Sequence, residues 1–361
     1  RENFRMQVGK VPIMVKSKHC HLYGLTSEQV IERGEDPDDP GGYFILNGNE
    51  RVLITVEDLA SNKMFVEKKK SGPSMYVARL FSERGAYRIP HELAQQKDGI
   101  IYLNFTRFKK IPAVSVIKAL GITKDEEIMK LASGDKHQFD TLIINLYNSV
   151  DLKKQNDAAE YVGSKLGLME QQKDLLIEKT LENLDKYLLP HLGVSKEDRL
   201  KKAYNLCKLI KRFLLIIDQN ISMDKDHYAN KRLKQSGDLL MDLFRVNMRA
   251  LVNDVLYNFQ RLVKRGKFSS VKIIIRDKLL TERIKSALAT GAWVGGRKGI
   301  SQNMDRTNFL ATLSHLNRVN SLLNASQENF SARALHSTHY GRFCPIETPE
   351  GTSIGLRKNL A

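Results

Sequence analysis

Residues 39–54 read DPGGYFILNGNERVLI, and this stretch predicts the first fixed point of the fold. Pro40 and the two glycines after it cannot continue a helix or a strand, so the stretch opens with a turn. Two apolar runs, 43–46 and 51–56, then flank the Asn-Gly pair at 47–48, which supplies the positive φ angles of a two-residue hairpin. The sequence therefore predicts a turn followed by a β-hairpin.

The chain around this hairpin is predicted to be rich in β-structure. Residues 8–16 (VGKVPIMVK) read as a short buried strand, and residues 64–68 and 74–81 read as two strands around the turn Ser71-Gly72-Pro73. A further strand is expected at 100–108, where a second block of the chain begins.

The second block, from about 82 to 229, is predicted to be mainly helical. Apolar residues recur at helical spacing in six segments, which are 113–120, 124–132, 138–148, 157–166, 169–188 and 197–217. Thr123 and Ser195 stand where helix N-caps are expected, and Pro190 and Gly193 separate the last two helices.

A long amphipathic helix is predicted next. Its apolar residues step by three or four and form one face: Leu240, Phe244, Met248, Leu251, Val255, Phe259 and Leu262. A stripe of this kind predicts packing against the rest of the fold. A strand is expected after the helix, at 270–276.

The last block, about 282–361, is rich in Asn, Ser, Thr, His, Gly and Arg. Short helices are expected at 282–290 and 307–317, and ordered loop elsewhere. The expected anchors of that loop are Phe330, Leu335, Tyr340, Phe343 and Ile346. The β-rich, helical and irregular blocks together predict a multidomain α+β fold.

The composition is that of a folded protein with a surplus of positive charge. Of its 361 residues, 42% are hydrophobic, and 58 Lys and Arg oppose 41 Asp and Glu, which gives a net charge of +17. This balance excludes a disordered chain. No apolar run approaches the roughly 18 residues that a membrane span needs, so no membrane partner is expected.

The positive charge gathers in the C-terminal part of the chain. Residues 201–280 hold 18 Lys and Arg against 7 Asp and Glu, and residues 281–361 hold 10 against 5, whereas the first 200 residues are nearly neutral. Such a concentration indicates a polyanionic partner, above all nucleic acid. The alternative is a helical face that is simply rich in lysine.

The cysteines and the chain ends indicate the setting of the protein. Cys20, Cys207 and Cys344 lie far apart, which argues against a disulfide scaffold and a four-cysteine zinc site and fits a reducing, cytoplasmic location. The chain begins at Arg1 without an initiator methionine and breaks off at Ala361, so we expect a piece of a longer polypeptide.

Two motifs could hold a ligand, and each has a plainer interpretation. The run Gly295-Gly296-Arg297-Lys298-Gly299 can bring backbone amides and two cations to a phosphate, but it lacks the P-loop spacing and is also typical of a turn. His315, His336 and His339 lie within reach of Cys344 in sequence, but no fourth ligand follows in a zinc pattern. Contacts of these imidazoles with phosphate, or packing, are favoured over a metal.

Neither acidic cluster of the chain lies in the last block, whose loops are expected to be functional. Two-metal phosphoryl transfer needs clustered carboxylates, and the clusters Asp36/Asp38/Asp39 and Asp224/Asp226 are predicted to form turns and caps instead. Any catalytic metal is therefore expected to come from another chain. Glu347 and Glu350 could act as acid or base, orient arginines such as Arg342, or belong to an ordered turn.

Five segments, in order along the chain, carry a family resemblance. They are VPIMVKSK (11–18), DPGGYFILNGNERVLI (39–54), DKDHYANKRL (224–233), GISQNMDRTN with TLSHL (299–308 and 312–316), and HSTHYGR running through TPEG to KNL (336–360). Together they resemble the second-largest subunit of multisubunit RNA polymerase, and the combination is most similar to the archaeal form, in which this subunit may be split into two chains.

The resemblance implies an architecture and a function. It implies a protrusion formed by residues 1–80 and 231–290, an inserted lobe at 81–230 and a fork at 291–361. The chain would line the channel for DNA and the RNA–DNA hybrid and support the active centre of the assembled nucleotidyltransferase, without being active alone. The alternative is a stand-alone basic nucleic-acid-binding protein, and the scarcity of clustered carboxylates disfavours a nuclease.

The resemblance also implies roles for particular residues. Those expected to position nucleic-acid phosphates are Arg297, Lys298, Arg306, His315, Arg318, Arg333, His336, His339 and Arg342. Those expected to support the active centre are Glu347, Thr348, Pro349, Glu350 and Gly351. The magnesium of the assembled enzyme would be held mainly by the largest subunit and not by this fragment. The implied partners are the largest subunit, the remaining subunits, the DNA template and the hybrid.

Overall fold

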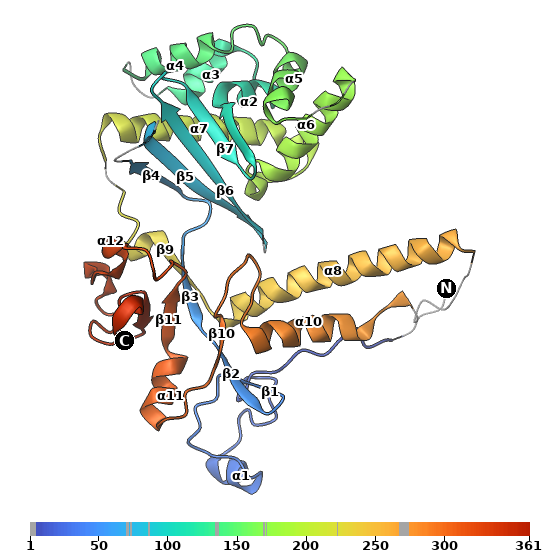
Figure 1. Ribbon diagram of the computed structural model, residues 1–361, viewed down its shortest axis with the longest axis vertical. Helices are drawn as coiled ribbons and strands as arrows, with labels where there is room; N and C mark the ends of the chain where they lie inside the picture. The colour runs from blue at the N-terminus through green and yellow to red at the C-terminus, as the bar shows by residue number, and fades with distance from the viewer. Residues whose placement is uncertain are drawn as a thin grey trace. The chain divides into compact units, whose positions relative to one another are not determined.

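The computed structural model describes residues 5–69, 72, 74–85, 87–133, 137–168, 170, 172–221, 223–266 and 274–361 (Figure 1). The chain forms two compact units. The first combines Arg1–Leu59 with Asp226–Ala361, and the second is the continuous stretch Ala60–Lys225. Each unit contains helices and β-sheet, so the predicted multidomain α+β fold is confirmed.

The hairpin predicted at the opening turn is present, but its second strand ends at Leu53 and not at residue 56. Strands β1 (Phe44–Leu46) and β2 (Asn49–Leu53) pair antiparallel, and β10 (Ser301–Asn303) joins the other side of β2. Asn47 and Gly48 adopt φ angles of 51° and 80°, the left-handed values that the two-residue turn requires.

A second sheet of the first unit joins segments that are far apart in sequence. Its strand order is β12 (Arg357–Asn359), β11 (Arg318–Ser321), β3 (Thr55–Leu59) and β9 (Lys231–Lys234). β11 runs parallel to β3, and the other two pairings are antiparallel. The sheet thereby connects the early hairpin region to the C-terminal end of the chain.

Two long helices, α8 (Ser236–Lys264) and α10 (Asp277–Thr290), pack side by side in the first unit (Figure 1). Their shared core includes Leu239, Leu280 and Trp293, and the Trp293 indole N–H donates to the Leu239 carbonyl at 2.9 Å. Among the described residues, this unit also has the α-helices α1 (Ser27–Glu32), α11 (Phe309–Leu316) and α12 (Phe330–Arg333).

The predicted helix is present in α8, but its predicted packing face is only partly right. Leu251 of the predicted stripe is buried and Leu240 packs against the core of the unit, whereas Phe244, Met248 and Phe259 are 41%, 36% and 43% exposed. The other buried apolar side chains of α8 are Leu239 and Leu243. The reason is that α10 and the small sheet cover one side of α8 only, and much of the predicted stripe lies away from them.

The second unit is built on a five-stranded antiparallel sheet. The strands follow in sequence order as β4 (Met64–Lys68), β5 (Ser74–Arg84), β6 (Tyr87–Gln96), β7 (Ile101–Phe105) and β8 (Phe108–Pro112). The single strand predicted at 100–108 is wrong, because Thr106 takes a φ of 51° and turns the chain into a second strand. Ser71 and Pro73 of the predicted turn lie outside the described residues.

All six predicted helices of the second unit are confirmed. They are α2 (Ala113–Ala119), α3 (Asp125–Ala132), α4 (His137–Tyr147), α5 (Gln155–Lys165), α6 (Lys173–Tyr187) and α7 (Arg199–Asp218). The N-cap of α3 is Lys124 and not Thr123 as predicted. Ser195 does act as a cap, for the 3₁₀ turn that leads into α7, with Asp198 as its capping-box partner.

The strand predicted at 8–16 is not present, although the structure describes every residue of that segment. Only Val15 forms a ladder-like pair of bonds, donating to Tyr43 and accepting from Gly42, so no neighbouring strand extends the pairing. Val11 and Ile13 are exposed as a result. Residues 270–273 of the other predicted strand lie outside the described residues, and Arg276 is the N-cap of α10.

The predicted helices of the last block are confirmed as parts of α10 and α11, but most of its predicted anchors are exposed. Phe343 alone of the five is buried, and Tyr340 is 92% exposed. Too few other residues of this chain pack around the remaining four side chains to bury them.

In the described part of the chain, no helix is long and apolar enough to cross a membrane.

Candidate nucleic-acid interface

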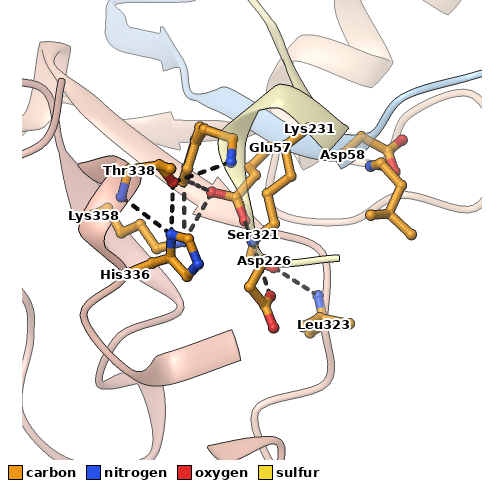
Figure 2. A network of polar contacts seen from close by, with 11 residues as sticks. Glu57, Asp58, Asp226, Lys231, Ser321, Leu323, His336, Thr338 and Lys358 are labelled. Carbon is orange, nitrogen blue, oxygen red and sulfur yellow. Dashed lines mark hydrogen bonds and ion pairs between the residues drawn. The ribbon is translucent and has the colours of Figure 1, made fainter. Parts of the chain in front are cut away.

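A buried ion cluster lies on one face of the four-stranded sheet (Figure 2). The register creates it: Lys231 pairs with Leu59, and Lys358 pairs with Val319, which itself pairs with Thr55. Leu59 and Thr55 flank Glu57 at a spacing of two, so all these side chains point to one face. Two lysines from distant segments thereby converge on one glutamate.

Glu57 accepts from both lysines at once. Its Oε1 lies 2.9 Å from Lys231 Nζ and its Oε2 lies 2.8 Å from Lys358 Nζ, while the Tyr228 hydroxyl also donates to Oε2. Asp226 Oδ1 lies 3.2 Å from Lys231 Nζ, so two carboxylates balance two ammonium groups. Burial raises the pKa of Glu57, but Lys358 and Lys231 more than offset it, and the pKa lies below its usual value.

Aromatic rings close the cluster on one side. The Tyr228 ring centroid lies 4.7 Å from that of Phe343 and 5.0 Å from that of His339, and the Tyr228 amide donates to Thr338 Oγ1 at 3.2 Å. Burial, with a contribution from the nearby Lys358, lowers the pKa of His339 to about 4. His339 is therefore a neutral, buried part of this packing. His336 accepts the Thr338 amide through Nδ1, as the N-cap of a short 3₁₀ turn.

The turn at 347–351 is held by its hydrogen bonds. Glu347 Oε1 accepts from Ser314 Oγ and from Asn359 Nδ2, the latter at 2.8 Å. Thr348 Oγ1 donates to the Arg357 carbonyl at 3.0 Å and accepts from the Gly355 amide at 2.9 Å.

The rest of this turn faces outward. Glu350 is exposed and Pro349 is half-buried. Gly351 takes a φ of 75°, a value that favours glycine, and begins the 3₁₀ turn Gly351–Ser353. The segment is thus an ordered turn, as one of the interpretations of the sequence predicted, and Glu350 is exposed.

Arg306 ties the last block to the opening turn. Its guanidinium donates to both carboxylate oxygens of Glu50, at 2.7 and 2.9 Å, and to Asp39 Oδ2 at 2.9 Å, and it lies 4.9 Å from the centroid of the Tyr43 ring. Burial raises the pKa of Asp39, but bonds from Gly41, Tyr43 and Arg306 outweigh it and lower the pKa overall. The bidentate geometry is that of a strong, orienting ion pair.

His315 is buried at the end of α11. The Asp305 amide donates to its Nδ1 at 3.1 Å, so the ring proton resides on Nε2, which lies 3.2 Å from Gln302 Oε1. Burial and the neighbouring Arg318 lower the pKa of His315. Arg318 itself lies half-buried in β11.

The glycine-rich run at 295–299 forms a tight turn, closed by the Trp293 amide donating to the Arg297 carbonyl at 2.8 Å. Arg297 Nη2 lies 3.0 Å from Asp58 Oδ2 and the arginine side chain is only 13% exposed, so its guanidinium is already engaged. Lys298, the next residue, is exposed.

Arg333 and Arg342, the last two arginines predicted to contact phosphate, also differ in how many hydrogen bonds they make within the chain. Arg333 donates to four backbone carbonyls, those of Thr352, Ile354, Ala325 and Gln327. Arg342 is exposed and donates once, to the Thr338 carbonyl at 3.2 Å. The exposed cations among the predicted contacts are therefore Lys298, Arg306 and Arg342.

The acidic clusters form turns and ion pairs. Asp36 accepts the Asp38 amide, Asp39 accepts the Gly41 amide, and Asp226 pairs with Lys231. Across the described ranges, no group of three or more His, Cys, Asp or Glu side chains could hold a metal ion.

No role was predicted from the sequence for Glu57, Tyr228, Lys231, Lys358 or Asn359. One signal for the cluster is present in the sequence: a glutamate followed by an aspartate inside an apolar strand, since a buried carboxylate requires a cationic partner.

Comparison with known proteins gives the class to which this fold and interface belong. The family model described as RNA polymerase beta subunit matches residues 1–282, and the model described as RNA polymerase Rpb2, domain 3, matches residues 302–361. The chain therefore belongs to the RNA polymerase beta-subunit family, the family of second-largest subunits, and the resemblance seen in the sequence is confirmed.

Particular relatives are archaeal. The chain is 45% identical over 357 residues to DNA-directed RNA polymerase subunit Rpo2 of Saccharolobus solfataricus, covering 98% of this chain and 32% of that protein. It is 44% identical over 362 residues to subunit Rpo2N of Halobacterium salinarum, covering 98% of this chain and 69% of that protein. It is 43% identical over 366 residues to subunit Rpo2N of Methanocaldococcus jannaschii, covering 100% of this chain and 73% of that protein. The chain thus spans about a third of the Saccharolobus relative.

Proposed function

We propose that this chain serves DNA-directed RNA synthesis as part of an archaeal-type polymerase, in which it lines the channel for DNA and the RNA–DNA hybrid. The observation that carries the proposal is the identity of 45% over 98% of the chain to a protein named as a DNA-directed RNA polymerase subunit. The positive charge of residues 201–361 supports it, because a channel wall for nucleic acid requires cations.

The exposed cations are the proposed contacts with nucleic acid. Lys298 and Arg342 are exposed, and the Arg306 side chain is 38% exposed although it pairs with two carboxylates. These residues would position phosphates without reading sequence. For His315, His339, Arg297 and Arg333 we propose that they shape the surface rather than touch the nucleic acid, because each is buried or bonded within this chain.

The proposed active centre is shared with another chain. The turn at 347–351 would support this active centre. The largest subunit would provide most of the ligands of the magnesium, whose charge would stabilise the reacting phosphates. The described residues offer no cluster of ligands for such an ion. We also propose that the chain alone makes no RNA.

The domain names follow from the same proposal. The lobe predicted at 81–230 would lie largely in the unit Ala60–Lys225, which is inserted into the unit that contains most of the protrusion and the fork. The partners would be the largest subunit, the other polymerase subunits, the template and the hybrid, in the cytoplasm.

A pull-down of the tagged subunit from its own cells, followed by mass spectrometry, tests the proposal. We expect the largest polymerase subunit to be the main partner. A chain that purifies without polymerase subunits and binds DNA tightly by itself would favour the alternative, a stand-alone nucleic-acid-binding protein.

A further inference from the structure

The short strand β12 joins the buried ion cluster to the turn at 347–351. Lys358, its central residue, points into the cluster, where Nζ lies 2.8 Å from Glu57 Oε2 (Figure 2). The residue on each side holds the turn: the Asn359 amide donates to Glu347, and the Arg357 carbonyl accepts from the turn. One strand of three residues therefore carries both sets of contacts.

We propose that Lys358 is a positioning residue: by anchoring β12 to Glu57, it sets the place of the turn at 347–351 in the active centre. The proposal rests on the proposed function, because the place of the turn in an active centre is part of that function.

The anchor is held firmly because the Lys358 side chain is buried and its ammonium donates two hydrogen bonds. The Lys358 side chain is 8% exposed, and its ammonium also lies 3.2 Å from the Tyr228 hydroxyl and above the ring of that tyrosine. If the Lys358 ammonium left this position, the buried Glu57 carboxylate would have one lysine partner instead of two. A charge in such a site is held far more firmly than one at the surface.

A second set of hydrogen bonds connects β12 to α11. Asn359 Nδ2 lies 2.9 Å from the Ser314 carbonyl and 2.8 Å from Ser314 Oγ, and Ser314 Oγ donates to Glu347. Glu347 is thus held by β12 directly and through α11. A shift of β12 would therefore displace both hydrogen-bond donors of Glu347, Asn359 Nδ2 and Ser314 Oγ.

Lys231 is the matched control. It pairs with the same carboxylate at 2.9 Å, its side chain is also 8% exposed, and it lies over the same tyrosine ring. It belongs to β9, however, at the opposite edge of the sheet from β12. Removing either lysine costs a comparable ion pair, but only Lys358 anchors the strand that holds the turn.

The test compares Lys358→Met with Lys231→Met in the assembled polymerase. Hydrogen exchange of peptides covering 344–351 is measured first, and the KM for nucleotides and kcat of template-directed elongation second. For Lys358→Met we expect about tenfold faster hydrogen exchange at 344–351, because one charge-assisted hydrogen bond is lost. We expect a raised KM as well. For Lys231→Met we expect both quantities within about twofold of the wild type.

Each outcome decides the proposal. Equal exchange at 344–351 in the two variants, or a change confined to Lys231→Met, would overturn it. If Lys358→Met does not assemble, Glu57→Gln replaces it and is expected to loosen the turn in the same way. A wild-type assembly that makes no RNA would refute the proposed function instead, and the exchange data would still test the anchor.

Discussion

The strongest energetic prediction concerns Glu57→Gln. Glutamine keeps the shape of the side chain but removes its charge, which leaves Lys231 and Lys358 opposed by Asp226 alone. The Glu57 side chain is only 4% exposed, so water cannot compensate the excess positive charge. Breaking a buried ion pair costs about 3–5 kcal/mol, and we expect about 3 kcal/mol because glutamine still accepts one hydrogen bond.

A second substitution should restore part of this loss. Glu57→Gln combined with Lys358→Met leaves Lys231 paired with Asp226, at 3.2 Å, and returns the cluster to neutrality. Replacing a buried pair by uncharged groups is often nearly neutral, so the double variant should recover at least half of the lost free energy of unfolding. The coupling between the two sites is expected to be about 2 kcal/mol.

Urea unfolding followed by tryptophan fluorescence measures these changes. Trp293 is the one tryptophan of the sequence and is buried in the same unit as the cluster, so its signal reports that unit. A cost below about 1 kcal/mol for Glu57→Gln, or a double variant less stable than the single one, would show that the charge of Glu57 does not stabilise the two lysines.

The same variant makes a prediction for acid. Because the folded-state pKa of Glu57 is lowered, its contribution is present above the unfolded-state pKa of about 4.3 and is lost as the pH falls through the folded value. Glu57→Gln should therefore show a smaller loss of stability in that range than the wild type. An equal loss in both proteins would show that Glu57 is not the group responsible.

Three further predictions concern other parts of the chain. Arg306→Lys keeps the charge but loses the fork toward Glu50, and because the side chain is 38% exposed we expect a loss of only about 1 kcal/mol by the tryptophan assay; no loss would argue against the bidentate pair. His91 is buried with a pKa of about 4, so acid favours the unfolded state as the pH falls from 6.5, by on the order of 3 kcal/mol in total; circular dichroism should show this dependence flattened in His91→Gln. Val252→Lys, on the exposed face of α8, should change stability by less than about 0.5 kcal/mol, whereas Leu243→Ala on the buried face should cost about 2–5 kcal/mol.

Local patterns in this sequence predicted local structure well. The Asn-Gly turn at 47–48 and the six helices of the second unit depend on neighbours within a few residues, and all of them are present. The strand at 8–16 failed because a strand needs a partner, and the sequence does not say whether one is available.

The candidate interface depended on contacts that the sequence does not display. Glu57 meets Lys231 and Lys358 across 174 and 301 positions, and Arg306 meets Glu50 across 256. Those pairings follow from strand register and from the return of the chain to the first unit. For this reason Arg306 was predicted as a phosphate contact, while the structure shows it first as a tie between two segments.

The central question is whether this chain acts only within an assembly. The decisive measurement is template-directed incorporation of labelled nucleotides, in magnesium, by the purified polymerase complex and by the isolated chain at equal concentration. We predict RNA from the complex and none from the chain alone. RNA made by the isolated chain, or a complex whose activity is unchanged when this chain is left out, would show that RNA synthesis does not depend on this chain acting within the complex.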